Sequence, residues 1–237
     1  MTLQDRWDVF WYRFATKGTW ERVITTGLVN TLMIAIIGLI IGIIIGTLIA
    51  SVRVMPKYKL MPRILDKFCG IYVGFFRGTP IVVQLLLAHF VIVPEVFSMR
   101  SDPLTTCIIV FGLNSGAYVS EIMRGGILSV DPGQMEAGRA VGMSYGATMM
   151  KIVVPQAIKH ILPTLGNELI ALVKDTSVVS MVAATDLTKT FLEIGNKNYE
   201  YLVPYCFMAL MYIVLVAIIS LGVKLLERRL RRSDRRN

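Results

Sequence analysis

Histidine and cysteine are scarce in this chain of 237 residues, which has two histidines and three cysteines. His89 and His160 lie far apart in the sequence, and neither an HExxH motif nor another metal-ligand cluster occurs. The cysteines are odd in number and widely spaced, in or beside apolar runs, so the sequence predicts no disulfide framework and no metal site. We interpret the two histidines as polar packing residues.

Two patterns typical of enzymes are also missing or incomplete. No GxxxxGK[ST] phosphate loop, the motif that binds nucleotide phosphates, occurs in the chain. The run Gly142-Met143-Ser144-Tyr145-Gly146 matches the GxSxG nucleophile elbow of hydrolases, but it lacks the strand–turn–helix setting that this motif requires. We therefore reject a hydrolase and expect that the protein is not an enzyme.

Charged residues make up only 17% of the chain, whereas hydrophobic residues make up 54% and the mean hydropathy is +0.62. A soluble domain would have a more average composition. Several apolar runs reach the roughly 20 residues that a helix needs to cross a bilayer. We therefore predict an all-α polytopic membrane protein without a cleavable signal sequence. Its five spans are expected at about residues 28–52, 67–93, 104–123, 157–183 and 201–226.

Lysine and arginine are distributed unevenly between the two predicted sides of the membrane. Sixteen of them fall on the side of the C-terminus and seven on the side of the N-terminus. Because basic residues collect on cytoplasmic loops, we expect the N-terminus outside and the C-terminus in the cytoplasm. The net charge of +9 then needs no nucleic acid, and we expect the basic tail, residues 227–237, to contact anionic membrane lipid.

The chain divides into three expected regions. Residues 1–22 carry Trp7, Phe10, Trp11 and Phe14 at helical spacing among charges, which favours either a short helix in the extracytoplasmic interface or a loosely ordered aromatic anchor. Residues 23–226 form the transmembrane domain, which includes the cytoplasmic segment 131–155. The basic tail follows. A polar loop that contains Glu193-Ile194-Gly195-Asn196-Lys197-Asn198 is expected before the last span.

Glycine and proline mark two of the spans. In the first span, Gly38, Gly42 and Gly46 form a ridge of small residues that allows close helix packing. In the second span, Arg77-Gly78-Thr79-Pro80 interrupts the helix, because proline removes a backbone hydrogen bond. A freed carbonyl in lipid must find a protein or water partner, so this break is expected to face the bundle interior.

The polar segment between the third and fourth spans predicts two short helices. Asp131-Pro132-Gly133 is a typical helix start, and residues 134–141 follow as one helix that Gly142 stops. Ser144 can cap a second helix over residues 145–153, which Pro155 should end. Small residues in the first helix, Ala137, Gly138 and Ala140, would make the protrusion slim enough to enter a groove.

This segment resembles the EAA loop of the permease subunits of ATP-binding-cassette (ABC) importers. The family pattern is Glu-Ala-Ala, three residues, Gly, then nine residues before an Ile-x-Leu-Pro ending. Five positions match it in place: Glu136, Ala137, Gly142, Ile152 and Pro155. Two positions depart from it, since Gly138 replaces the second alanine and Val154 replaces the leucine.

Further blocks resemble the polar amino acid branch of that family, in the correct order over about residues 19–226. They read Phe76-Arg77-Gly78-Thr79-Pro80, Leu113-Asn114-Ser115-Gly116-Ala117-Tyr118, Glu121-Ile122-Met123-Arg124-Gly125-Gly126-Ile127, Leu165-Gly166-Asn167-Glu168 and Lys174-Asp175-Thr176-Ser177.

The resemblance implies a type I permease in the bacterial cytoplasmic membrane that imports a polar amino acid. It implies that the loop docks on a separate ATPase dimer, through Glu136, Ala137, Gly138, Gly142, Ile152 and Pro155. ATP and magnesium would be handled by that ATPase, so no cofactor is expected in this chain. A second permease, identical or similar, and an extracytoplasmic substrate-binding protein would complete the importer.

Charged and polar residues inside the predicted spans allow two interpretations. They could line the path for the ammonium and carboxylate groups of an amino acid, or they could pair with one another and hold the bundle together. Arg77 could also extend to the interface. An ion-coupled secondary amino acid transporter is the alternative function, although five spans do not supply two repeated halves. The candidates for the path are Arg77, Asn114, Glu121, Glu168, Lys174 and Asp175.

Overall fold

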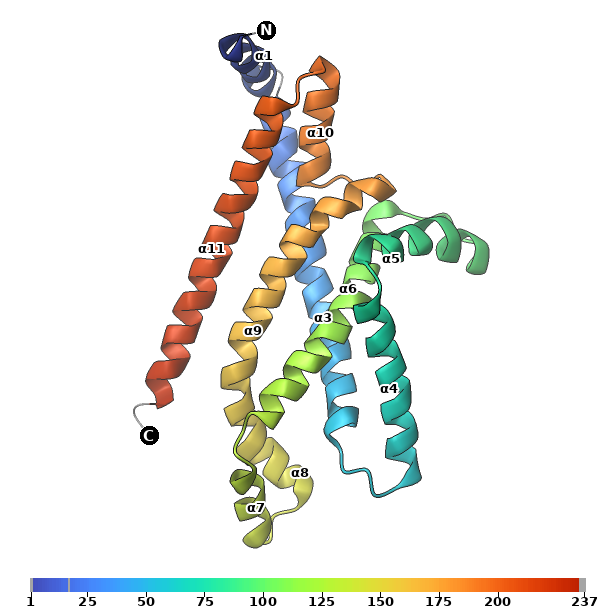
Figure 1. Ribbon diagram of the computed structural model, residues 1–237, viewed down its shortest axis with the longest axis vertical. Helices are drawn as coiled ribbons and strands as arrows, with labels where there is room; N and C mark the ends of the chain where they lie inside the picture. Colours follow the sequence, from blue (N-terminus) through green and yellow to red (C-terminus); the bar gives the residue numbers. More distant parts are fainter. Residues whose placement is uncertain (1, 17, 235–237) are drawn as a thin grey trace.

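Two long helices that cross closely, α3 and α6, form the centre of the molecule (Figure 1). The computed structural model describes residues 2–16 and 18–234, and within those residues it forms helices and no strand, as predicted. The helices are α1 (Leu3–Thr16), α2 (Thr19–Arg22), η1 (Val23–Leu28), α3 (Val29–Val54), α4 (Leu60–Gly78), α5 (Ile81–Leu87), η2 (Ala88–Val96), α6 (Pro103–Leu128), α7 (Pro132–Ala140), α8 (Tyr145–Thr148), η3 (Met149–Val153), α9 (Val154–Asp175), η4 (Thr176–Val182), α10 (Leu187–Asn198) and α11 (Leu202–Asp234).

The predicted glycine ridge is the contact surface between α3 and α6. Gly42 of α3 lies against Ser115, and Gly46 lies against Val119, whose Cγ1 would be 2.7 Å from an added Cβ. In return, Gly112 and Gly116 of α6 receive branched side chains of α3. Small residues on both helices therefore let the backbones approach each other closely, as they do in other membrane bundles.

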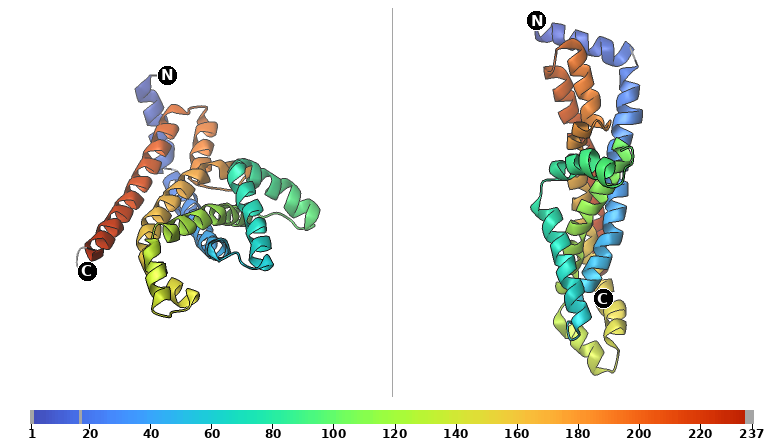
Figure 2. Two further views of the ribbon diagram at one scale, coloured as in Figure 1. Left: turned by 60° about the horizontal axis from the view of Figure 1, so that its bottom comes forward. Right: turned by 90° about the vertical axis from the view of Figure 1, so that its right-hand side faces the viewer.

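The N-terminal segment is helical, as the first of the two expectations for residues 1–22 requires, whereas its place in the membrane interface stays a prediction. Figure 2 shows α1 lying across the ends of the long helices. Its Phe10 is buried and packs on Phe207 of α11, with 4.8 Å between the ring centroids. The expected boundary after residue 22 lies inside continuous helix, since α2, η1 and α3 follow one another without a break.

The second predicted span is sharply bent. Helix α4 ends at Gly78, α5 begins at Ile81, and the two parts, α4 and α5 with η2, meet at 103°. The predicted start of this span, at about residue 67, was too late, because α4 already begins at Leu60. Pro62 is tolerated there since the first turn of a helix does not need its N–H.

The expected polar loop with residues 193–198 was wrong, because these residues belong to helix α10. The Asp186 carboxylate caps this helix by accepting hydrogen bonds from the N–H groups of Thr188 (3.0 Å) and Lys189 (2.8 Å). Leu187 and Phe191 are fully buried at a spacing of one helical turn and pack with Phe10. Capping and an apolar stripe together explain the helix.

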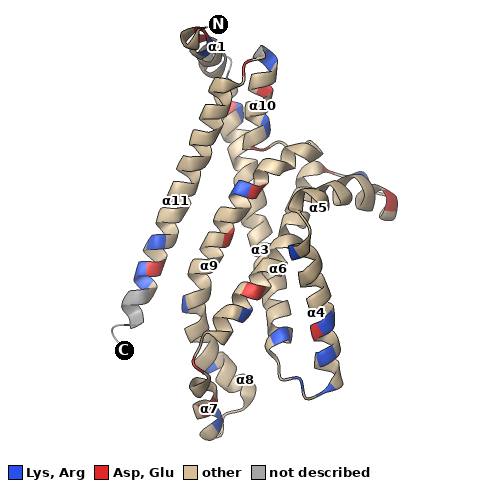
Figure 3. Ribbon diagram, in the orientation of Figure 1, with Lys and Arg blue, Asp and Glu red and all other residues tan. Residues whose placement is uncertain are grey.

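Three helical segments within the described residues are long and apolar enough to cross a membrane: Thr19–Val54, Pro103–Leu128 and Leu202–Leu230. The bent pair of α4 with α5 and η2 gives a fourth if it is counted as one span. Helix α9 interrupts its apolar surface with charged residues, as Figure 3 shows, and is not among them. The count of five spans therefore stays a prediction.

Figure 1 places the α3–α4 connection, the α7–α8 turn and the C-terminal part of α11 toward one end of the molecule, with α1 and α10 at the other. These are the groupings that the charge distribution predicted. Helix α11 continues through Asp234, so most of the predicted tail prolongs the last span. Residues 235–237 of the tail lie outside the described residues.

Candidate functional site

A cavity of about 580 Å³ opens beside the bend between α4 and α5. The loop of the bend forms one wall, while α6 and α9 form the others. Four of the six residues predicted for the path line it: Arg77, Asn114, Glu168 and Asp175. The sequence thus identified residues that are 98 positions apart in the chain and lie around one cavity.

The bend is stabilised by two side-chain amides. Gln84 Nε2 donates hydrogen bonds to the carbonyl oxygens of Phe76 (2.9 Å) and Thr79 (3.0 Å). The Phe76 carbonyl has no helical partner because Pro80, four residues later, has no N–H, and the Thr79 carbonyl lies in the break itself. Asn114 Nδ2 donates to Gln84 Oε1 (3.0 Å) and to the Phe76 carbonyl (3.2 Å). The expectation that the break faces protein is therefore confirmed, and Asn114 both lines the cavity and holds its wall.

The acidic residues of α9 face this cavity. Ser115 Oγ of α6 donates a hydrogen bond to Glu168 Oε1 at 3.1 Å. Asp175 lies seven residues further along the same helix and lines the same cavity. No ion pair within 4.0 Å joins either carboxylate to a lysine or arginine in the part of the chain that the structure describes.

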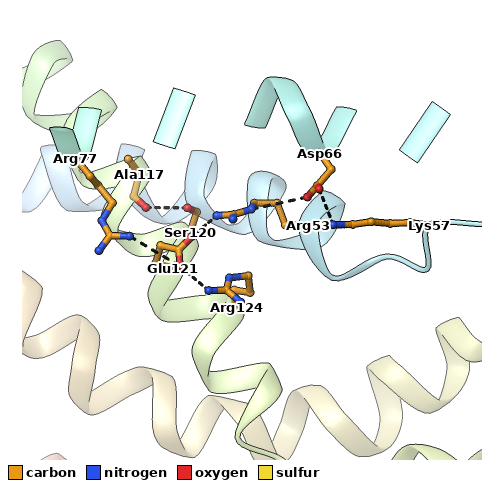
Figure 4. A network of polar contacts seen from close by, with 8 residues as sticks. All are labelled: Arg53, Lys57, Asp66, Arg77, Ala117, Ser120, Glu121 and Arg124. Carbon is orange, nitrogen blue, oxygen red and sulfur yellow. Dashed lines mark hydrogen bonds and ion pairs between the residues drawn. The ribbon is translucent and has the colours of Figure 1, made fainter. Parts of the chain in front are cut away.

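Glu121 lies instead in an ionic cluster next to the cavity (Figure 4). It pairs with Arg53 of α3, with Arg124 at 2.8 Å and with Arg77 at 3.9 Å. Asp66 of α4 extends the cluster by accepting from Lys57 at 2.5 Å. Of the two interpretations of Glu121, this geometry favours the ion pair that joins α3, α4 and α6.

Lys174 faces away from the cavity. It lines a second, mostly apolar hollow of about 490 Å³ between α9 and α11, together with Met208, Tyr212 and Ile213. Lys174 and Asp175 therefore line two different cavities, although they are neighbours in sequence. The prediction that Glu168 and Lys174 do not share one helical face agrees with this arrangement.

The loop between α6 and α9 has the predicted capping residues. The Asp131 carboxylate accepts from the Gly133 N–H (2.8 Å), and Ser144 Oγ accepts from the Ala147 N–H (3.2 Å). Gly142 adopts φ +85° between the two helices, a conformation that favours glycine. Glu136 and Ala137 are exposed on α7, and Val141 at the tip is 78% exposed.

One expectation for this loop was wrong. Pro155 does not end the second helix, because α8, η3 and α9 follow one another without a break; the π-helical turn at η3 lets the Val154 N–H bond to the Met149 carbonyl. Gly138, one of the small residues of the first short helix, is not exposed. It is buried against Thr148, whose Cγ2 would lie 2.4 Å from an added Cβ.

The loop is also fastened to the transmembrane helices. The Tyr145 hydroxyl donates a hydrogen bond to the Val54 carbonyl at the end of α3 (3.2 Å). Burial raises the pKa of Tyr145, so this hydroxyl keeps its proton. Within the loop, the exposed Arg139 side chain donates a hydrogen bond to the Met143 carbonyl (2.7 Å). A force on the exposed tip would therefore reach α3 as well as α9.

Sequence reasoning missed three residues of these sites. Gln84 was a polar residue in an apolar run, four positions after Pro80, and that spacing was the available signal. Tyr118 lines the cavity and lies under the Arg77 guanidinium, 5.5 Å from its ring centroid. Arg53 looked like an ordinary loop cation, and only the packing of α3 on α6 brings it to Glu121.

A comparison with protein families decides the class of this chain. The model of the family described as "Binding-protein-dependent transport system inner membrane component" matches residues 42–232. The chain belongs to this family. The match spans the cavity and the loop, and membrane components of this kind are transport subunits that work with a separate ATPase and a substrate-binding protein.

Three relatives of this inner membrane component are each named as the permease protein of an amino acid transport system. The chain is 39% identical to the arginine transport system permease protein ArtQ of Bacillus subtilis, over 69% of this chain and 74% of ArtQ. It is 31% identical to the glutamine transport system permease protein GlnP of Escherichia coli, over 92% and 99%. It is 36% identical to the L-cystine permease TcyB of Bacillus subtilis, over 89% and 87%.

Solved structures show the same fold. A chain of an amino acid ABC transporter crystallised with histidines superposes with a TM-score of 0.82 at 35% identity, covering 91% of this chain and 98% of that one. The inward-facing methionine transporter MetNI matches with a TM-score of 0.72 at 19% identity, which shows the fold alone. The inner membrane component therefore has the type I permease fold, as expected.

Proposed function

We propose that this inner membrane component is the permease subunit of an ATP-driven importer of polar amino acids in the bacterial cytoplasmic membrane. The observation that supports it best is the cavity beside the α4–α5 bend, which offers both acidic and basic side chains at a site lined by α6 and α9. An amino acid carries both charges, so such a cavity can hold it inside an apolar bundle. The named relatives act on amino acids that differ in charge.

The exposed tip of the α7–α8 loop is the proposed contact with the ATPase. It presents Glu136, Ala137 and Val141 to solvent, while Ser144 and Gly142 fix the angle between the two short helices. Ile152 and Pro155, which match the family pattern, lie on the continuous helix that leads from the tip to the cavity wall. Closure of an ATPase dimer would thus move α9, and with it Glu168 and Asp175.

Two further partners belong to the proposal. A second permease, identical or similar, would complete the path, and a binding protein would deliver substrate at the end formed by α1 and α10. In this orientation the N-terminus is extracytoplasmic and the α7–α8 loop is cytoplasmic, in keeping with the distribution of basic residues. Family membership favours this ATP-driven importer over the ion-coupled secondary transporter.

The test is reconstitution of the permease with its ATPase and binding protein in liposomes. We expect amino acid uptake that requires ATP on the side of the membrane where the α7–α8 loop lies. We also expect the substrate-loaded binding protein to stimulate ATP hydrolysis. Glu136→Lys should reduce both, because it reverses an exposed charge at the proposed contact. The matched control is Glu95→Lys, an exposed residue of η2 outside the α7–α8 loop. Equal activity of the Glu136 and Glu95 variants would contradict the assigned contact.

A further inference from the structure

The charges that line the cavity are unequal in number. Glu168 and Asp175 contribute two carboxylates, Arg77 contributes one guanidinium, and the other lining residues are uncharged. Lys174 lines the separate hollow between α9 and α11, and in the described residues it forms no ion pair within 4.0 Å with either carboxylate. The cavity thus has two negative groups and one positive group.

The two carboxylates lack a strong cationic partner in the described part of the chain. Glu168 is bonded only to the neutral hydroxyl of Ser115 at 3.1 Å, and neither it nor Asp175 takes part in an ion pair there. Charges inside a membrane bundle are costly unless they are paired. A cationic ligand would therefore gain more from this cavity than a neutral ligand of the same size.

The guanidinium is held loosely by comparison. Arg77 is 3.9 Å from Glu121, whereas Arg53 and Arg124 already pair with that carboxylate at shorter range (Figure 4). Its side chain keeps 45% exposure and rests on the face of Tyr118. Arg77 can therefore turn toward a ligand carboxylate without leaving Glu121 unpaired, and arginine is well suited to bind a carboxylate with two N–H groups.

We infer that the cavity selects cationic amino acids, a specificity that rests on the proposed function. A basic amino acid has two cationic groups and one carboxylate, which is the inverse of the cavity. Its α-carboxylate would meet Arg77, and its α-ammonium and side-chain cation would meet Glu168 and Asp175. These two residues are two helical turns apart, roughly 10 Å along α9, so separate groups of one ligand can reach them.

Other amino acids fit this charge pattern less well. A neutral amino acid such as glutamine leaves one carboxylate of the cavity unpaired. An acidic amino acid adds a second negative group to a site with a single guanidinium, and like charges at close range repel. The expected order of affinity is therefore arginine and lysine first, glutamine next and glutamate last.

The test measures binding to the permease–ATPase complex in lipid nanodiscs, without the binding protein, so that only the cavity selects. Radiolabelled L-arginine is bound, and L-lysine, L-glutamine and L-glutamate compete. We expect lysine to compete like arginine, and glutamine and glutamate to compete at least tenfold more weakly. Competition by glutamine or glutamate at the level of lysine would overturn the inference, and so would absence of arginine binding.

Variants separate the roles of the three charges. Glu168→Gln and Asp175→Asn should each weaken arginine binding at least tenfold while changing glutamine binding little, whereas Arg77→Gln should weaken both. Each variant is compared with Glu95→Gln, an exposed carboxylate of η2 that does not line the cavity. If one acidic variant fails to assemble, the other still decides. Unchanged arginine affinity in an assembled acidic variant contradicts the inference.

Transport distinguishes failure of the inference from failure of the proposed function. ATP-dependent uptake of glutamine or glutamate in preference to arginine would overturn the cationic specificity and leave the importer standing. Uptake of no amino acid at all, in a complex that binds ATP and its binding protein, would overturn both.

Discussion

Gly142 joins the two short helices of the loop with φ +85°, and its missing Cβ would meet no atom within 4 Å. Glycine is therefore favoured at this position by its positive φ, and not by a lack of room for a side chain. Gly142→Val should cost at least about 1 kcal/mol in that conformation and change the angle of the tip. We expect weaker retention of the ATPase on copurification, whereas Gly142→Asn should retain it better because asparagine tolerates positive φ. Full retention by the valine variant would show that the angle is unimportant.

Gly138 presents the opposite case, because space decides its role. An added Cβ would lie 2.4 Å from Thr148 Cγ2, so Gly138→Ala should overpack the loop at a cost of about 1–3 kcal/mol. Gly146→Ala is the control, since nothing lies within 4 Å of Gly146. Limited proteolysis of the loop should be faster in the Gly138 variant only, and Thr148→Ser in the same chain should restore much of the protection.

At the scale of elements, the bend between α4 and α5 depends on Gln84. Gln84→Leu removes the donor for the Thr79 and Phe76 carbonyls and the acceptor for Asn114. Unsatisfied buried polar groups cost about 1–3 kcal/mol each, so the midpoint of thermal unfolding in detergent should fall. Gln4→Leu, an exposed change in α1, should leave the midpoint unchanged. Equal midpoints for the two variants would contradict this account of the bend.

The ionic cluster makes a second prediction about elements. Glu121→Gln leaves Arg124 without its carboxylate and Arg53 with only the 3.9 Å contact to Asp66, so the contacts among α3, α4 and α6 should loosen and the thermal midpoint should fall. Glu193→Gln is the comparison, because Glu193 forms one partly exposed pair with Arg22, and such pairs contribute about 0–1 kcal/mol. A smaller effect at Glu121 than at Glu193 would contradict the structural role of the cluster.

The sequence predicted these elements unevenly, for physical reasons. The caps at Asp131 and Ser144 and the break at Pro80 are local, so they could be read from neighbouring residues. Helix α10 was missed because its polar residues hid the buried stripe of Leu187 and Phe191, which is stabilised by contacts with distant α1. The continuation of helix through Pro155 depends on a π-helical turn that has no clear sequence signal.

At the scale of the whole molecule, hydropathy was enough to predict a membrane protein, but it did not show which residues line the cavity. Composition alone predicted an all-α membrane protein, and ordered motifs predicted the family to which the chain belongs. Only the folded structure shows which surface each charged residue faces. Glu168 and Asp175 face the cavity, Glu121 faces arginines, and Lys174 faces the hollow by α11, yet all four are acidic or basic residues inside apolar runs.

The most direct test of the central claim is the energy source of uptake in liposomes that hold the permease, its ATPase and the binding protein. We expect amino acid uptake that requires ATP hydrolysis and persists when proton and sodium gradients are collapsed. Gly142→Val should lower uptake and substrate-stimulated hydrolysis together. Uptake by the permease alone, driven by an ion gradient and unchanged by Gly142→Val, would contradict the account.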